Sequence, residues 1–206
     1  MGKWRFRSWG ALFGAFLVIT INGNTDQKPA SERLERFTSA LLESQGADGS
    51  AVALVETTGT SFTVGDMICI NSSRNKLGPV EFVLAHEVGH ILAGHCQISG
   101  EPKEETRAME KEADLLGAEM LHNLGLDRAI FERIGDLRIY GADCVWEDED
   151  HPSLTENAEY LSEFLIGVGY TQEQIDRFCE EYSKTRCEEL RRLYEEENRD
   201  QAAAKK

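Results

Sequence analysis

Two histidines and a glutamate within five residues could hold a metal ion and move a proton. The chain carries the run His86-Glu87-Val88-Gly89-His90. In a helix, residues four apart lie one turn apart on the same face, so both imidazoles can reach one metal ion. Glu87 can then lie beside a water molecule at the metal and accept its proton. The run therefore predicts a zinc site that activates water, with Glu87 as the general base.

The residues around this run predict the helix that must position it. The stretches Val80 to Ala85 and Ile91 to Gly94 are largely apolar, as expected for a mostly buried helix. Pro79 suits the first helical position, where its missing N–H costs little, and Gly94 suits the end. Both histidines and Glu87 are thus expected on one rigid element.

A catalytic zinc ion usually takes three protein ligands, so a third ligand must be found. The pattern HExxHxxGxxH would need a histidine at position 96, where the chain has Cys96. His95 misses that position by one, and on a continuing helix it would be turned away from the metal-facing side. We expect His95 to interact with the last carbonyl groups of the helix.

The third ligand is expected on a second helix downstream. Glu110 and Asp114 are four residues apart and border an apolar stripe, where a carboxylate is costly unless it is paired or binds a metal. We predict Glu110 as the third ligand of one zinc ion and Asp114 as the acceptor for a histidine N–H. Glu112 is expected at the solvated surface. The stripe comprises Met109, Ala113, Leu116, Met120 and Leu124.

These motifs resemble the gluzincins, zinc peptidases with HExxH on one helix and a glutamate on the next. The segment Ile68-Cys69-Ile70-Asn71, the run ending at His90 and the Glu110–Asp114 pattern are most similar to the ImmA/IrrE family, over residues 51–126. The resemblance implies His86, His90 and Glu110 as zinc ligands. It also implies a protein or peptide substrate, in particular a specific regulatory protein.

A second resemblance lies further along the chain. Residues 112–117 together with His151-Pro152-Ser153-Leu154 are similar to HtpX-like peptidases. That resemblance implies an alternative function as a membrane-tethered quality-control peptidase. A second alternative is a zinc-containing regulatory or binding module without turnover, although the presence of Glu87 favours an enzyme. Tyr140 and His151, beyond the metal helices, are candidates to stabilise the oxyanion.

Composition and the amino terminus give opposing indications of location. The net charge of −15 argues against nucleic-acid binding through a basic face. Five cysteines without paired spacing favour reduced thiols and a cytoplasmic protein. However, basic residues precede an apolar run at positions 9–21, which resembles a signal peptide or a membrane anchor. Export, membrane anchoring and an upstream extension from a misplaced start therefore stay open.

The remaining patterns predict an α+β fold, with a small antiparallel sheet packed on the two metal-binding helices and a helical extension at the carboxyl end. Strands are expected at residues 51–55, 60–64 and 67–70. Capping boxes at Ser153 and Thr171 mark two later helices. Three segments result: a signal-like or anchor-like segment (1–23), the zinc metallopeptidase core (24–145), and an acidic loop with the helical extension (146–206).

Overall fold

A computed structural model describes residues 28–50, 52–56, 61–70, 79–95, 103–143 and 153–204 of the 206-residue chain. The predicted apolar segment at residues 9–21 and the candidate oxyanion donor His151 lie outside the described residues. Among the helices that are described, none is long and apolar enough to cross a membrane.

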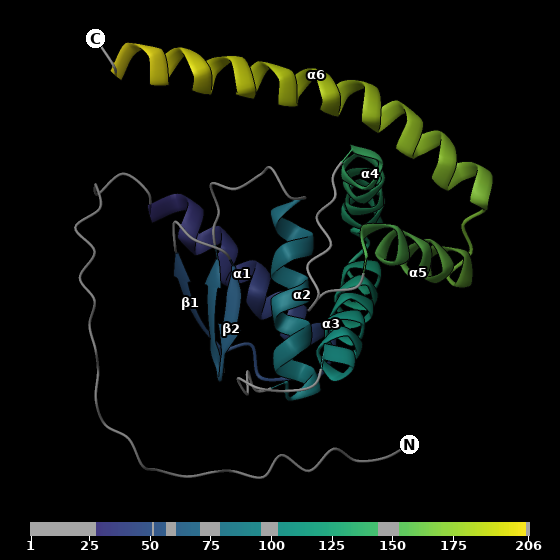
Figure 1. The fold of residues 1–206 in the computed structure, drawn as a ribbon. Coiled ribbons are helices and arrows are strands. Elements are labelled where there is room, and N and C mark those ends of the chain that lie inside the picture. Colours follow the sequence, from purple (N-terminus) through teal and green to yellow (C-terminus); the bar gives the residue numbers. More distant parts are fainter. Residues whose placement is uncertain are drawn as a thin grey trace.

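The described chain forms six helices and one three-stranded sheet (Figure 1). The α+β class predicted from the sequence is confirmed. In chain order the elements are α1 (Lys28–Ser44), β1 (Ala53–Glu56), β2 (Phe62–Val64), β3 (Met67–Ile70), α2 (Val80–Ala93), α3 (Lys103–Asn123), α4 (Asp127–Asp143), α5 (Leu154–Gly167) and α6 (Gln172–Ala204).

The sheet is mixed, so the prediction of a wholly antiparallel sheet is wrong. Strand β3 lies in the middle, antiparallel to β2 and parallel to β1. Ile68 and Ile70 of β3 are fully buried, whereas Phe62 and Val64 of β2 are exposed. The most apolar strand therefore takes the central place and separates the other two, which makes β2 an edge strand of the described sheet.

Helix α2 is the central element that carries the HExxH run. Phe82, Leu84 and Val88 are buried in the core, as expected for an apolar helix enclosed by its neighbours. The helix follows Pro79 and ends at Gly94, which adopts the left-handed conformation with φ 72°. In Figure 1, α2 stands between the sheet and α3, and it contacts both.

Helices α2 and α3 approach each other closely at two glycines. A Cβ atom added to Gly89 would lie 2.5 Å from the carbonyl oxygen of Ala113, and one added to Gly117 would lie 3.0 Å from the backbone of Ala85. Only glycine permits this backbone contact. The close approach brings the HExxH run of α2 beside the carboxylates of α3.

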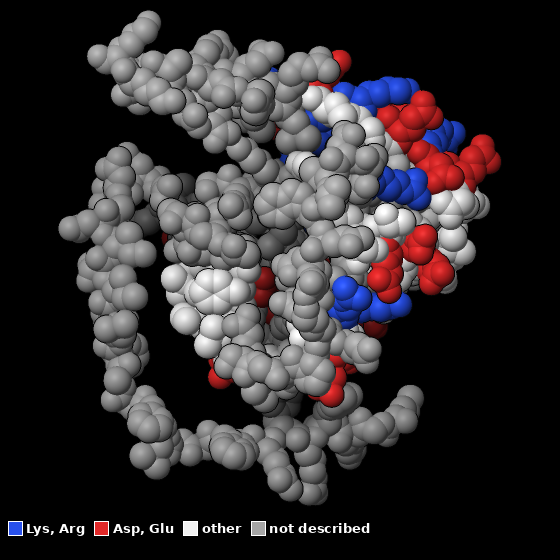
Figure 2. All heavy atoms as spheres, in the orientation of Figure 1, with Lys and Arg blue, Asp and Glu red and all other residues white. Residues whose placement is uncertain are grey.

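The carboxyl-terminal helices begin where the capping boxes predict. The Ser153 hydroxyl accepts from the Glu156 N–H, and Thr171 and Gln174 exchange two hydrogen bonds at the start of α6. Figure 2 shows basic and acidic side chains interspersed on the described part of one face. Separately, Arg128 and Glu132 on α4, four residues apart, form an ion pair of this mixed kind.

Candidate metal centre

Three predicted ligands converge between α2 and α3. His86 Nε2 lies 3.0 Å from His90 Nε2 and 3.3 Å from a carboxylate oxygen of Glu110. His90 Nε2 lies 3.5 Å from the other carboxylate oxygen of Glu110. Among the described residues, these three form the one group of histidine, cysteine or acidic side chains close enough to share a metal ion.

The spacing of these atoms suits a tetrahedral zinc ion. Bonds of about 2.0–2.1 Å at tetrahedral angles place ligand atoms roughly 3.3 Å apart. The three distances among His86, His90 and Glu110, 3.0, 3.3 and 3.5 Å, lie around that value. Two imidazoles and one carboxylate are also a donor set that zinc takes in hydrolases. The side chains therefore fit the metal without rearrangement of the helices.

His86 is held from behind by a buried carboxylate. Its Nδ1 lies 2.7 Å from Asp114 Oδ1, and Asp114 is only 3% exposed. The other oxygen of Asp114 accepts a short hydrogen bond from the hydroxyl of Tyr160, on α5. Asp114 therefore lies where the sequence placed an acceptor for a histidine N–H, and Tyr160 fixes it in turn.

The carboxylates around His86 favour a positive charge at this position. Burial opposes protonation, but Asp114, Glu110 and Glu87 outweigh it and raise the pKa of His86 to about 10. Burial would raise the pKa of Asp114, yet His86, Arg133 and Tyr160 hold it below its usual value. In the absence of a metal ion, a proton on His86 thus balances part of the negative charge of these carboxylates.

His90 is supported by a different group, His95. Their Nδ1 atoms lie 3.0 Å apart, and His95 Nε2 lies 3.2 Å from a carboxylate oxygen of Glu112. His95 is not one of the three side chains of the metal cluster, but its contact with His90 was not expected. The helix ends at Ala93, and the left-handed Gly94 folds the chain back. Glu112 is exposed as predicted, but its carboxylate reaches His95.

The predicted general base, Glu87, is buried beside the sheet. Its carboxylate accepts a hydrogen bond of 2.7 Å from the hydroxyl of Thr63, on β2. The same hydroxyl lies 3.2 Å from the backbone carbonyl of Glu87. Burial of an acidic side chain requires such a partner. Thr63 thus ties the edge strand to the helix that carries the two histidines.

Sequence reasoning missed Thr63, Tyr160 and the role of His95. Tyr160 could have been predicted to face the interior from its helical spacing, because it lies on the same buried face of α5 as Asn157, three residues before it. Thr63 carried no such signal beyond its place in a short strand. Tyr140, a predicted oxyanion donor, lies on α4 and is partly buried.

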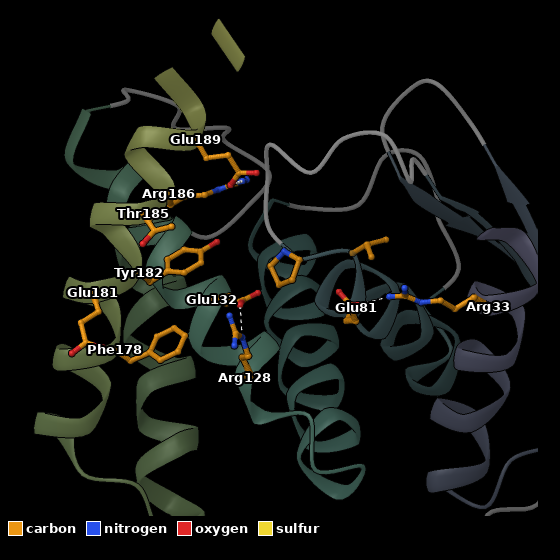
Figure 3. A pocket seen from close by; sticks show the side chains of 12 residues that line it. Arg33, Glu81, Arg128, Glu132, Phe178, Glu181, Tyr182, Thr185, Arg186 and Glu189 are labelled. Carbon is orange, nitrogen blue, oxygen red and sulfur yellow. Dashed lines mark hydrogen bonds and ion pairs between the residues drawn. The ribbon is translucent and has the colours of Figure 1, made fainter. Parts of the chain in front are cut away.

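A separate cleft of about 630 Å³ opens between α6 and helices α4, α2 and α1 (Figure 3). The side chains of His86, His90 and Glu110 do not line it. Four of its charged side chains form two pairs, with Arg33 3.1 Å from Glu81 and Arg128 2.7 Å from Glu132. The cleft and the metal cluster are therefore separate features of the described residues.

The predicted resemblance to the ImmA/IrrE family is confirmed by comparison with known proteins. Residues 46–137 match the family model of the IrrE N-terminal-like domain, which is a model of peptidases. The matched segment includes both helices of the metal centre. No curated protein and no solved structure matches the chain. The HtpX-like features of residues 112–117 and 151–154 find no support in these comparisons.

Proposed function

We propose that this protein is a zinc-dependent metallopeptidase of the gluzincin type, which cleaves peptide bonds with one zinc ion held by His86, His90 and Glu110. The convergence of these three side chains, at the spacing of a tetrahedral site, carries the proposal. A zinc ion there would polarise a water molecule and the carbonyl group of the substrate.

In this proposal Glu87 is the general base and acid. Glu87 directly follows His86 in the sequence. Its negative charge contributes to the raised pKa of His86, which indicates that the carboxylate of Glu87 lies close to the candidate zinc ligands. Glu87 accepts the proton of the attacking water and later delivers it to the leaving amine. Thr63 holds one carboxylate oxygen, so the other can face the reacting atoms.

The edge of the sheet suits an extended peptide as substrate. Strand β2 pairs with β3 on one side, and no described strand pairs with its other side. A peptide that adds to this edge through backbone hydrogen bonds would lie beside Thr63 and therefore beside Glu87. The exposed Phe62 and Val64 side chains flank Thr63 on the same strand and offer apolar contacts.

The family resemblance directs the proposal toward a specific regulatory protein as the substrate and not toward a broad pool of peptides. Two alternative functions predict different results in the tests described below. One is a zinc-containing binding module without turnover. The other is a membrane-tethered quality-control peptidase.

Metal analysis tests the ligand set. We expect the purified protein to bind one zinc ion, Glu110→Ala to lose it, and Glu112→Ala to keep the full stoichiometry at saturating zinc. The two residues lie on the same helix and carry the same charge, so Glu112→Ala controls for the loss of a carboxylate from α3. Zinc loss in Glu112→Ala but not in Glu110→Ala would show that the ligand is misassigned.

Substrate trapping tests the reaction. We expect Glu87→Gln to keep zinc and the fold but to lose cleavage, because an amide cannot accept the proton. Partners that accumulate on Glu87→Gln in the native cell should be cleaved by the zinc-loaded wild type. Partners that are never cleaved would replace the peptidase proposal with the binding module.

A further inference from the structure

We infer that His95 and Glu112 form a hydrogen-bonded support that orients His90 and tightens the metal site. This inference rests on the proposed zinc site, in which His90 is a ligand through Nε2. His95 was not expected to face His90, and Glu112 was expected to be an ordinary surface residue. Their contacts give both residues a positioning role.

The placement of protons along this chain of groups is determined by the metal-facing atom. If His90 binds through Nε2, its Nδ1 must carry the proton and donate it. The atom 3.0 Å away is His95 Nδ1, which must then be the acceptor. His95 in turn carries its proton on Nε2, which lies 3.2 Å from the Glu112 carboxylate. Each nitrogen thus has one complementary partner.

The end of helix α2 places His95 in this position. The His95 N–H donates to the carbonyl of His90 at 3.0 Å, and the Gly94 N–H donates to the carbonyl of Ile91 at 3.1 Å. These bonds form a Schellman motif, which requires a residue in the left-handed conformation. Gly94 fulfils that requirement with φ 72°. The turn therefore fixes both the backbone and the imidazole of His95 over the last turn of α2.

The two ligand histidines consequently have unequal supports. His86 is backed by the buried Asp114, whereas His90 is backed by a neutral imidazole and by Glu112, whose side chain is 61% exposed. Water competes with His95 for the exposed carboxylate of Glu112, so Glu112 restrains its histidine less than Asp114 restrains His86. The His95 side chain itself is only 10% exposed, which shields its bond to His90.

The first test measures zinc affinity by competition with a chelator. We expect His95→Ala to weaken zinc binding about 10- to 100-fold, the range typical when a partner of a ligand histidine is removed. His95→Gln, whose carbonyl can accept the His90 proton, should recover part of the loss. His122→Ala is the matched control: His122 also pairs with a carboxylate near a helix end, Asp127 at 2.7 Å, but lies on α3 three turns from Glu110.

The second test separates orientation from stability. Gly94→Ala and Gly125→Ala introduce the same strain, because both glycines have positive φ (72° and 70°) and open space around a new Cβ. Gly125 ends α3 with the same pair of backbone bonds. We expect similar falls in melting temperature in the zinc-free proteins, but weaker zinc binding in Gly94→Ala alone.

A direct readout is the His90 Nδ1–H proton in the zinc-loaded protein, observed by NMR. We expect a protected resonance in wild type and in His95→Gln, and its loss in His95→Ala. Unchanged zinc affinity and an unchanged resonance in His95→Ala would overturn the inference while the proposed function stands. A wild-type protein that binds no zinc would instead overturn the proposed function.

Discussion

At the scale of single residues, a metal ion bound by His86, His90 and Glu110 would compete with a proton on His86. The pKa of His86 is raised to about 10, against about 6.5 in an unfolded chain, so the metal-free protein carries a proton there at neutral pH. Zinc binding must release it. We expect about one proton released from His86 per zinc at pH 7, measured by calorimetry in buffers of different ionisation enthalpy. Heats independent of the buffer would contradict this.

The same shift determines how the stability of the metal-free protein changes with pH. Because the folded pKa of His86 lies above its unfolded value, the protonated histidine stabilises the fold fully below about pH 6.5, and this contribution is lost as the pH rises toward 10. We expect the difference in unfolding free energy between wild type and Asp114→Asn to be large near pH 6 and to shrink toward pH 10. Denaturant unfolding at several pH values measures it.

The hydroxyl of Thr63 should matter for turnover more than for the fold. Thr63→Val removes the bond to Glu87 in a buried place, where hydrogen bonds to charged groups are worth about 1.5–3 kcal/mol. We expect zinc binding to persist and cleavage of the trapped substrate to fall about tenfold or more. Thr38→Val is the control, since this buried hydroxyl donates to the carbonyl of Leu34 on its own helix, α1. Equal activities of the two variants would show that Thr63 is merely structural.

The side chains of the candidate metal cluster could be predicted from the sequence, but those that support them largely could not. Helical spacing places His86 and His90 on one face, and the cost of a carboxylate near a core singles out Glu110 and Asp114. His95 depends on the chain leaving the helix at Gly94, and a periodicity argument assumes that the helix continues. Thr63 depends on the packing of a strand against α2, which no local pattern encodes.

At the scale of elements, the distance between α2 and α3 positions Glu110 opposite the two histidines. We expect Gly89→Ala and Gly117→Ala to force the helices apart, because each new methyl group would meet the backbone of the other helix. Overpacking of this kind costs about 1–3 kcal/mol. Zinc affinity should fall together with the melting temperature of the metal-free protein.

Gly167→Ala is the matched control for these substitutions. Gly167 also lies in a helix, the end of α5, but nothing surrounds its Cβ position. Alanine there should leave zinc affinity unchanged and leave stability unchanged or up to about 1 kcal/mol higher. Normal zinc affinity in both Gly89→Ala and Gly117→Ala would show that the helix contact does not set the ligand geometry.

Helices were easier to predict than the pairing of strands. The capping boxes at Ser153 and Thr171 lie at the starts of α5 and α6, because these hydrogen bonds form within a few residues. The order of the three strands depends instead on which one is most deeply buried, and this placed β3 in the centre, parallel to β1. Strand pairing joins residues distant in sequence, so the antiparallel prediction had no local evidence to correct it.

At the scale of the whole molecule, residues 1–23 should be dispensable for zinc binding and for the fold. Their apolar run is continuous and lacks the period of an amphipathic helix, and a polar segment separates it from α1. We expect deletion of residues 1–23 to leave the melting temperature and zinc stoichiometry unchanged. Deletion to residue 36 should instead lower the melting temperature clearly, because it removes the buried Leu34 and the first half of α1. A large fall in melting temperature on deletion of residues 1–23 would mean that this segment belongs to the core.

The helical extension reaches the metal centre although the family match ends at residue 137. Tyr160 on α5 donates to Asp114, which supports His86. We expect Tyr160→Phe to weaken zinc binding severalfold, because Asp114 loses one of the donors that hold its carboxylate in place. Chelator competition measures the affinity, and thermal melts of the metal-free protein measure the accompanying loss of stability.

Tyr170→Phe is the matched control for Tyr160→Phe. Tyr170 follows α5 and donates to Asp127 at 2.7 Å, so it is a second tyrosine–aspartate pair between the carboxyl-terminal part and the matched domain. Loss of either hydroxyl should destabilise the protein, but only loss of the Tyr160 hydroxyl should change zinc affinity. Equal zinc affinities in the two variants would show that α5 contributes to stability but not to the metal site. A lower affinity in Tyr160→Phe alone would show that the metal site depends on a residue outside the matched segment 46–137.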